Sequence, residues 1–168
     1  MKSLIINLKI VVLILFFAGI VTSCMDSNDD STSSNTAETE AALIAKWRAQ
    51  MKSKNIAYDS TATKIYYVID KTKVGSGANV APGNTVTVKY TGTYMDGTIF
   101  DSSDSFTYVQ KASTSRMIAG WEEAIELLNK GSKATFLIPS ALAYGPYGYY
   151  TIPPYSPLFF VIEVVDIK

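Results

Sequence analysis

The sequence predicts an α+β protein in which one sheet covers one short helix. After residue 63, most segments alternate between apolar and polar residues, which is the pattern of strands with one buried face. Residues 119–128 instead carry their apolar residues at helical spacing. A single amphipathic helix among many strands buries its apolar side against a sheet, so we expect the two to pack together.

The apolar stripe of the helix expected at 119–128 consists of Trp121, Ala124, Ile125 and Leu128. Three glutamates take the opposite face, and two of them lie in the first turn, where the helix dipole favours negative charge. Residues 129–131 predict the end of the helix, with Gly131 as a candidate left-handed cap. Trp121 offers the largest apolar area, and this pattern leaves open whether it only packs in the core or also lines a site.

The composition excludes several kinds of function. The 168 residues suffice for one domain with appendages, and a formal net charge of zero offers no basic surface to a nucleic acid. The chain has no histidine, which excludes serine triads, histidine zinc sites and histidine acid–base catalysis. A single cysteine excludes an internal disulfide and a cysteine-rich metal site. We therefore expect no metal and no cofactor.

Residues 1–23 have the features of a lipoprotein signal peptide. Lys2 and Lys9 precede an apolar run at 10–20, which suits a signal peptide and is short for a membrane span. The following Val-Thr-Ser-Cys ends at Cys24 and resembles the lipobox of bacterial lipoproteins. That resemblance implies cleavage before Cys24 and acylation of its thiol, a stable anchor when more than one acyl chain is attached. The alternative is a chance cysteine after an ordinary signal peptide.

A tether (residues 24–39) and a helical extension with its connector (residues 40–61) should lead to the domain. The tether is rich in Asp, Ser, Asn and Thr and cannot bury apolar surface, so we expect it to stay disordered. A helix is expected at 38–52, and its modest apolar stripe consists of Leu43, Trp47, Gln50 and Met51. Packing on the domain is the default role of this helix; pairing with a second copy and contact with a client are the alternatives.

The expected strands of the domain are residues 65–69, 85–91, 98–103, 106–109, 134–138 and 158–165. Turn residues at 73–77 close the first strand, and Asp96-Gly97 predicts a hairpin between the second and the third. The second strand alternates strictly, and its apolar face consists of Val86, Val88 and Tyr90. The last strand is apolar on both faces, which predicts a central position in the sheet.

Four stretches resemble one known family in their order and spacing: residues 88–103, 117–123, 141–145 and 152–160. They contain Tyr-Thr-Gly, Asp-Gly-Thr-Ile-Phe-Asp, Ala-Gly-Trp-Glu-Glu and Ala-Leu-Ala-Tyr-Gly. Together they are similar to the FKBP-type peptidyl-prolyl cis–trans isomerases, which bind tacrolimus and rapamycin. The resemblance identifies residues 62–168 as the isomerase domain. It implies a strongly curved antiparallel sheet wrapped around one short helix.

The resemblance also implies a proline-sized pocket. Its catalytic positions correspond to Tyr90, Phe100, Asp101 and Tyr144. Its substrate-binding positions correspond to Phe106, Tyr108, Met117, Ile118, Trp121, Ile152 and Phe160. Trp121 should form the floor, the Ile118 N–H should bond a substrate carbonyl, and the Tyr144 hydroxyl should donate to the bound peptide.

Several of these residues also have a purely structural interpretation. Phe106 and Phe160 would be buried in any version of this fold. Asp101 could cap a turn with the serines that follow it, and Tyr90 could serve only to orient Asp101. Tyr108 stands where phenylalanine is common in the family, which makes that wall slightly more polar.

The function that follows from the resemblance is faster rotation about Xaa-Pro bonds in proteins of the cell envelope. The partners would be proline-containing polypeptides, with tacrolimus- or rapamycin-type compounds as ligands and a membrane reached through Cys24. We expect the chain at the outer membrane of a Gram-negative cell, with its domain periplasmic or surface-exposed. The alternative is a non-catalytic peptide-binding or chaperone module that uses the same pocket. The oligomeric state stays open, including pairing through residues 38–58.

Overall fold

A computed structural model describes residues 35–168 of the chain. The expected signal peptide (1–23), the expected lipidation site Cys24 and most of the expected tether lie outside these described residues. No helix between residues 35 and 168 combines the length and the apolar character needed to cross a membrane.

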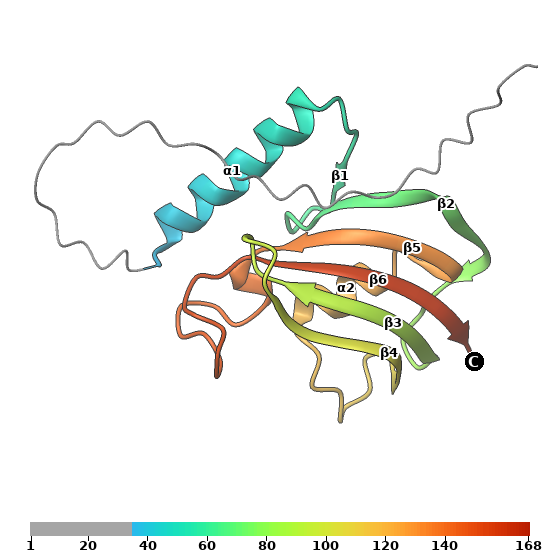
Figure 1. Ribbon diagram of the computed structural model, residues 1–168. Coiled ribbons are helices and arrows are strands. Elements are labelled where there is room, and N and C mark those ends of the chain that lie inside the picture. Colours follow the sequence, from blue (N-terminus) through green and yellow to red (C-terminus); the bar gives the residue numbers. More distant parts are fainter. Residues whose placement is uncertain (1–34) are drawn as a thin grey trace, which may run out of the picture. The chain divides into compact units, whose positions relative to one another are not determined.

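The domain is built on a six-stranded antiparallel sheet in the order β1-β2-β5-β6-β3-β4 (Figure 1). Its strands are β1 (Asp59–Ser60), β2 (Tyr66–Asn79), β3 (Thr85–Thr93), β4 (Ile99–Val109), β5 (Asn129–Ile138) and β6 (Leu158–Ile167). The helices are α1 (Ala37–Ser53), the short α2 (Ala119–Ile125) and the 3-10 turn η1 (Ser140–Leu142). This arrangement confirms the predicted α+β fold with one short helix and an N-terminal helical extension.

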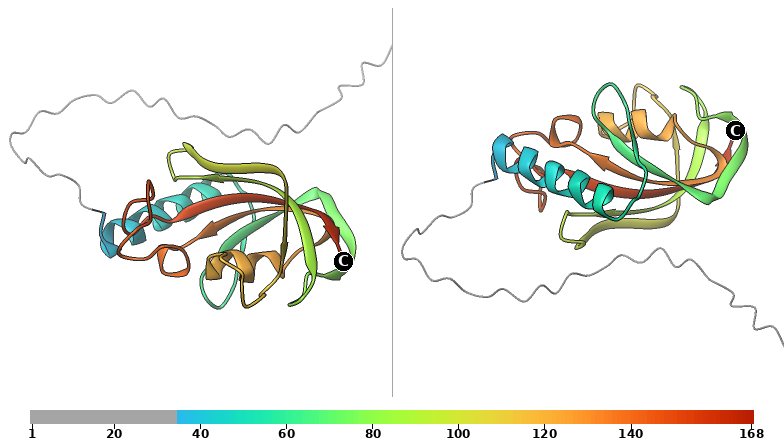
Figure 2. Two further views of the ribbon diagram at one scale, coloured as in Figure 1. Left: turned by 90° about the horizontal axis from the view of Figure 1, so that it is seen from below. Right: turned by 90° about the horizontal axis from the view of Figure 1, so that it is seen from above.

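The main core lies between α2 and one face of the sheet (Figure 2). Trp121, Ala124 and Ile125 of α2 are buried there against every second residue of the central strands. On β6 these residues are Leu158, Phe160, Ile162 and Val164. Because side chains alternate across a strand, their neighbours are left for the opposite face. The strand β6 pairs with β5 and β3, which confirms its predicted central position.

The opposite face of the sheet is covered by α1. Trp47 is buried there against Tyr66, Leu137 and Phe159, and the ring centroids of Trp47 and Phe159 lie 6.1 Å apart. Thr36 begins the helix with a capping box, because its hydroxyl accepts from the Thr39 N–H while the Thr39 hydroxyl accepts from the Thr36 N–H. The helix therefore packs on the domain, which confirms the default prediction for its role.

The buried face of α1 differs from the predicted one. Ile44 and Met51 pack beside Trp47, whereas Leu43 is 40% exposed and Gln50 is also exposed. The prediction of Leu43 and Gln50 in the stripe was wrong, because a helix of modest amphipathicity fits two neighbouring faces and the aromatic surface of the sheet selects one of them.

The helix α2 is shorter than predicted. It ends at Ile125, and β5 begins at Asn129, so Gly131 lies inside a strand and does not cap the helix. Gly131 has a φ of +86°, and it lies beside Gly75, which has a φ of +72°. A Cβ on Gly75 would come within 2.6 Å of the Lys130 carbonyl. The two glycines therefore adopt positive φ values in an irregular part of the β2–β5 pairing, where the two backbones approach closely.

Two strands are longer than predicted. The strand β2 continues through residues 73–77, which were expected to close it, and its pairing with β5 has two register shifts, between Ile69 and Val74 and between Ser76 and Asn79. The expected strands at 98–103 and 106–109 form one strand, β4, which pairs with β3 across a bulge near Tyr90. Backbone pairing continues through both segments although their side chains do not alternate in polarity.

Candidate active site

A small cavity of about 100 Å³ opens between α2, β4 and the loop after η1. It is lined by Tyr90, Phe100, Asp101, Phe106, Arg116, Met117, Ile118, Trp121, Tyr144 and Phe160. The structure thus brings together all of the predicted catalytic and substrate-binding residues except Tyr108 and Ile152. Arg116 was not predicted. We call this space the prolyl cavity, after the proline-sized pocket that the family resemblance predicts.

Trp121 forms the floor of the prolyl cavity and is 3% exposed. The rings of Tyr90 and Phe160 meet it edge to face, at centroid distances of 5.1 and 5.3 Å. The preceding Gly120 lets α2 approach β5, since a Cβ there would lie 2.3 Å from a methyl carbon of Ile138. The helix can therefore place its first tryptophan beneath the concave face of the sheet.

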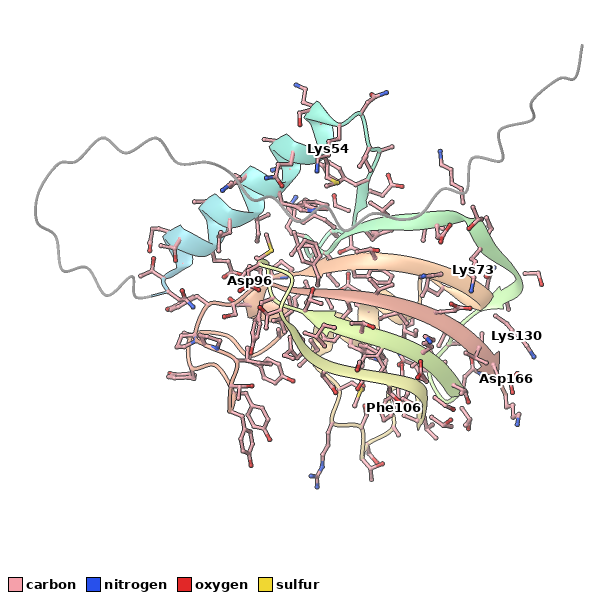
Figure 3. The ribbon with its side chains drawn as sticks, in the orientation of Figure 1. Lys54, Lys73, Asp96, Phe106, Lys130 and Asp166 are labelled. Atoms are coloured by element: carbon pink, nitrogen blue, oxygen red, sulfur yellow. The ribbon has the colours of Figure 1, made fainter. Side chains whose placement is uncertain are left out.

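The walls of the prolyl cavity come from β3, β4 and β6. Phe106, labelled in Figure 3, meets the Tyr90 ring edge to face at 5.9 Å. Phe100 meets the Phe160 ring edge to face at 5.6 Å. These perpendicular contacts hold the rings as a fixed apolar cup with little freedom to collapse inward.

The main polar contact of the cavity joins Tyr90 to Asp101. The Tyr90 hydroxyl donates to a carboxylate oxygen of Asp101 at 2.7 Å. Burial, and then the hydrogen bond to Asp101, raise the pKa of Tyr90 well above its ordinary value. The hydroxyl therefore stays protonated at neutral pH, and it orients a carboxylate that is itself exposed at the rim.

The rim carries backbone groups and a second tyrosine. Ile118 is the N-cap residue of α2 and has an extended backbone, and its carbonyl accepts from the N–H groups of Trp121 and Glu122. Its own N–H has no hydrogen-bond partner among residues 35–168. Tyr144 lies half-buried and stacks on Tyr149 with centroids 5.3 Å apart. Burial raises the pKa of Tyr144, so its hydroxyl is a proton donor at neutral pH.

Tyr108 lies behind the floor and does not line the prolyl cavity. Its hydroxyl accepts from the Trp121 indole N–H at 2.9 Å and donates to the side-chain oxygen of Gln110 at 3.1 Å. Gln110 is fully buried, and its amide donates to the Glu122 carbonyl and the Glu126 carboxylate. Burial raises the pKa of Tyr108 to about 12. Tyr108 is thus placed to position Trp121.

Ile152 also lies outside the cavity lining. It is 7% exposed, belongs to the main core and forms an isolated antiparallel bridge with Tyr149. Ile152 therefore lies beneath the loop that carries Tyr144 and anchors this loop to the core.

Sequence reasoning missed Arg116, which lines the cavity, and Gln110, which bonds to Tyr108 behind the floor. Arg116 is exposed and directly precedes Met117, so its position before a predicted rim residue was the available signal. Gln110 directly follows β4, and the acceptors of its amide lie on α2 (Glu122) and at the C-cap of α2 (Glu126), so only the folded chain brings them together. Arg116 and Asp101 are the charged side chains of the lining.

The chemistry of the cavity is that of a binding cup. Among residues 35–168, no group of three His, Cys, Asp or Glu side chains is placed to hold a metal ion. The lining offers aromatic faces, two tyrosine hydroxyls, one carboxylate and one guanidinium. Such a cup suits a small apolar ring whose flanking amides need hydrogen bonds.

Comparisons with known proteins agree on one family. The family of FKBP-type peptidyl-prolyl cis-trans isomerases matches residues 76–165. The outer membrane protein MIP of Legionella longbeachae is 39% identical over 104 residues, covering 61% of this chain and 43% of that protein. The FKBP-type isomerase FkpA of Aeromonas hydrophila is 38% identical over 109 residues, covering 65% of this chain and 40% of that protein. This chain thus matches less than half the length of either relative.

Solved structures show the same fold. The crystal structure of FkpA from Escherichia coli superimposes with a TM-score of 0.64 at 30% identity, over 78% of this chain and 62% of that one. A peptidyl-prolyl cis-trans isomerase from Pseudomonas syringae superimposes with a TM-score of 0.62 at 31% identity, over 77% of this chain and 96% of that one.

Proposed function

Since the chain belongs to the FKBP-type peptidyl-prolyl cis–trans isomerase family, we propose that it accelerates rotation about Xaa-Pro bonds in client polypeptides. The observation that carries the proposal is the aromatic cup over Trp121, with the Tyr90–Asp101 hydrogen bond at its rim. Uncatalysed isomerisation takes tens to hundreds of seconds, which is slow enough to limit the folding of a client.

The proposed mechanism is solvent exclusion around a twisting amide. Rotation about a peptide bond has a barrier of about 18–20 kcal/mol, because the planar amide is stabilised by charge-separated resonance. The twisted transition state loses this resonance, and its carbonyl is less polar. An apolar cup therefore favours the transition state relative to water, which solvates the planar amide better. No covalent bond has to break.

The proposed roles of the polar groups follow from their positions. The Ile118 N–H donates a hydrogen bond to a client carbonyl and holds the backbone beside the proline. The Tyr144 hydroxyl donates to a second client carbonyl. Asp101, oriented by Tyr90, faces the rotating carbonyl carbon, and Trp121 supports the proline ring. Each group fixes part of the client while the prolyl bond turns.

The proposed cellular setting is the bacterial envelope, with Cys24 acylated and anchored in the outer membrane. The sequence of residues 1–24 supports this proposal, and one of the relatives is named an outer membrane protein. Expressed with its own leader, the protein should lose residues 1–23 and gain the mass of its acyl chains. Cys24→Ala, or an inhibitor of signal peptidase II, should leave the leader uncleaved, as mass spectrometry would show. Ordinary cleavage without added acyl mass would contradict the anchor.

The test of isomerase function is a cis–trans assay on an Ala-Pro tetrapeptide with the chain from residue 25 onward. Wild-type protein should accelerate the reaction, and tacrolimus should inhibit it. Asp101→Leu combined with Phe100→Ala should lower kcat/KM by at least about a hundredfold, near 2.7 kcal/mol of transition-state stabilisation. Asp104→Leu is the matched control, because Asp104 lies exposed on the same strand outside the cavity.

Two outcomes would count against the assignment. No acceleration by a folded wild-type protein would contradict the isomerase function, and peptide binding without turnover would then favour the non-catalytic alternative. Acceleration that the Asp101 and Phe100 double variant leaves unchanged would show that the reaction happens outside the prolyl cavity.

A further inference from the structure

A second and larger cavity, of about 510 Å³, lies near the prolyl cavity. Its walls are the N-terminal part of α1, the turn between β3 and β4, and the loop at 151–157. Its lining includes Leu43, Tyr94, Met95, Asp96, Thr151 and Pro153. We call it the lateral groove. The proposed mechanism makes no use of it.

The lateral groove adjoins the prolyl cavity through two aromatic rings. Phe100 lines the prolyl cavity and Tyr94 lines the groove, and their ring centroids lie 5.2 Å apart. The Tyr94 hydroxyl donates to the Thr151 carbonyl at 2.8 Å, which connects the loop to the turn that follows β3 at the boundary. A polypeptide that leaves the prolyl cavity over Phe100 therefore reaches the groove next.

The distance between the two sites suits a short stretch of extended chain. The rings of Trp121, Phe160, Phe100 and Tyr94 follow one another at centroid distances of 5.3, 5.6 and 5.2 Å. The sum of these distances is an upper bound on the separation of Trp121 and Tyr94. An extended chain advances about 3.3–3.6 Å per residue, so at most roughly five residues separate a proline over Trp121 from a side chain in the groove.

The lining of the groove indicates the chemistry of its occupant. Leu43 is 40% exposed on a helix whose other face packs on the sheet, and Met95 and two prolines, Pro153 and Pro157, share the lining with it. Asp96 is the charged side chain of the lining, and Figure 3 shows it at the opposite end of the sheet from Lys130 and Asp166. Apolar surface with one carboxylate favours apolar or basic client residues and disfavours acidic ones.

We propose that the lateral groove binds the segment of the client at most about five residues from the isomerised proline, through its apolar side chains. The proposal rests on the prolyl isomerase function proposed above and extends the bound region from one bond to a stretch of unfolded chain. Such a second site would raise the affinity for long unfolded clients without changing the chemistry at the proline.

The experiment compares peptides that contain the same Ala-Pro bond. One is a tetrapeptide, and the others have twelve residues with a Leu-Phe pair or a Ser-Ser pair placed five residues before or after the proline. One of the Leu-Phe peptides should show kcat/KM about tenfold above its Ser-Ser version, mostly through KM. Leu43→Lys and Thr151→Lys should each remove this gain and leave tetrapeptide turnover unchanged. Ala49→Lys should keep the gain, because Ala49 is exposed on α1 outside the groove.

Three outcomes overturn an assignment, and each is distinct. Equal turnover of the Leu-Phe and Ser-Ser peptides, or a gain that survives both lysine variants, overturns client binding in the groove. Absence of tetrapeptide turnover contradicts the proposed isomerase function instead. Self-association of the wild type that Leu43→Lys abolishes, measured by sedimentation, assigns the groove to a second copy of this chain and overturns the client proposal.

Discussion

At the scale of single residues, Tyr108 shows how one hydroxyl connects the floor of the prolyl cavity to the interior. It links the Trp121 indole to buried Gln110, and Gln110 in turn reaches Glu126, which pairs with Lys111 at 2.8 Å. The most aromatic part of the site is therefore held by a line of hydrogen bonds that ends at the surface.

Tyr108→Phe removes this hydroxyl and little else. It leaves the Trp121 N–H and the Gln110 side-chain oxygen without their partner, so the free energy of unfolding should fall by about 1–3 kcal/mol. Urea unfolding measures the loss, and the emission spectrum of Trp121 in a Trp47→Phe background reports the altered indole environment. Tyr67→Phe is the control, since Tyr67 is half-buried and its hydroxyl forms no hydrogen bond among residues 35–168. Equal stability of the two variants would contradict the positioning role.

The same hydroxyl predicts a pH dependence of stability. The pKa of Tyr108 is about 12 in the folded protein, and that of an unfolded tyrosine is about 10. A raised folded pKa means that the folded state holds the proton more tightly. The stabilisation from Tyr108 is thus complete below pH 10 and is lost as the pH rises through 12. The difference in unfolding free energy between wild type and Tyr108→Phe should shrink from pH 9 to pH 11; a constant difference would contradict the coupling.

The residues that line the cavity were largely predictable because the sequence motifs place them. Tyr90, Phe100 and Trp121 each lie in a short stretch whose spacing resembles the family. Gln110 was not predictable, since a buried amide is stabilised by partners on another element that only tertiary structure brings close. The position of Tyr108 behind the floor was not predictable for the same reason, because its hydroxyl bonds to Trp121 of α2 and to Gln110.

At the scale of elements, α1 is joined to the loop that carries Tyr144. The Glu40 carboxylate accepts from the Ser140 N–H at 2.6 Å and from the Ser140 hydroxyl at 2.5 Å. Ser140 is 3% exposed, and its carbonyl accepts from the N–H groups of Ala143 and Gly145. The helix therefore helps to hold the start of this loop from the far face of the sheet.

Glu40→Ala should loosen this start of the loop. The buried Ser140 N–H loses its acceptor, which costs about 1–3 kcal/mol of local stability. Hydrogen exchange at residues 140–145 should speed up, and the exchange of β6 should stay unchanged. Glu40→Gln should restore most of the protection because its amide oxygen still accepts, while Glu38→Ala serves as the control from the same turn of α1. Unchanged exchange in Glu40→Ala would show that the contact does not hold the loop.

Elements were predictable where periodicity was strong and not where two arrangements fit equally well. The strict alternation at 85–91 predicted the buried face of β3. The weak stripe of α1 did not separate Leu43 from Ile44, and the aromatic surface around Phe159 decides between them. The serines and aspartates of β4 break the alternation of polarity, because a bulge changes which side chains share a face, so one continuous strand was predicted as two.

At the scale of the whole molecule, the two faces of the sheet carry different elements. The prolyl cavity and α2 lie on one face, and α1 covers the other. A chain that begins at residue 57 should therefore be less stable, since burial of one large apolar side chain such as Trp47 contributes about 1.5–3 kcal/mol. Its tetrapeptide turnover should stay within about fivefold of wild type, roughly 1 kcal/mol of transition-state free energy.

Thermal unfolding and the tetrapeptide assay measure these two effects separately. Trp47→Ala in the longer chain is the companion variant, because it removes the packing and keeps the backbone of α1. A folded short chain without turnover would show that the reaction requires α1, either directly or through the contact of Glu40 with Ser140 at the start of the loop that carries Tyr144.

The position of β6 has a consequence for how the protein forms. This strand follows the other strands in the sequence, yet it lies between β5 and β3 in the middle of the sheet. Until it arrives, β3 and β5 expose unpaired backbone edges, and α2 has only part of its cover. A chain delivered through a translocation channel from its N-terminal side would thus remain open until residues 158–167 emerge. The protein should then close in one late, cooperative step of high contact order.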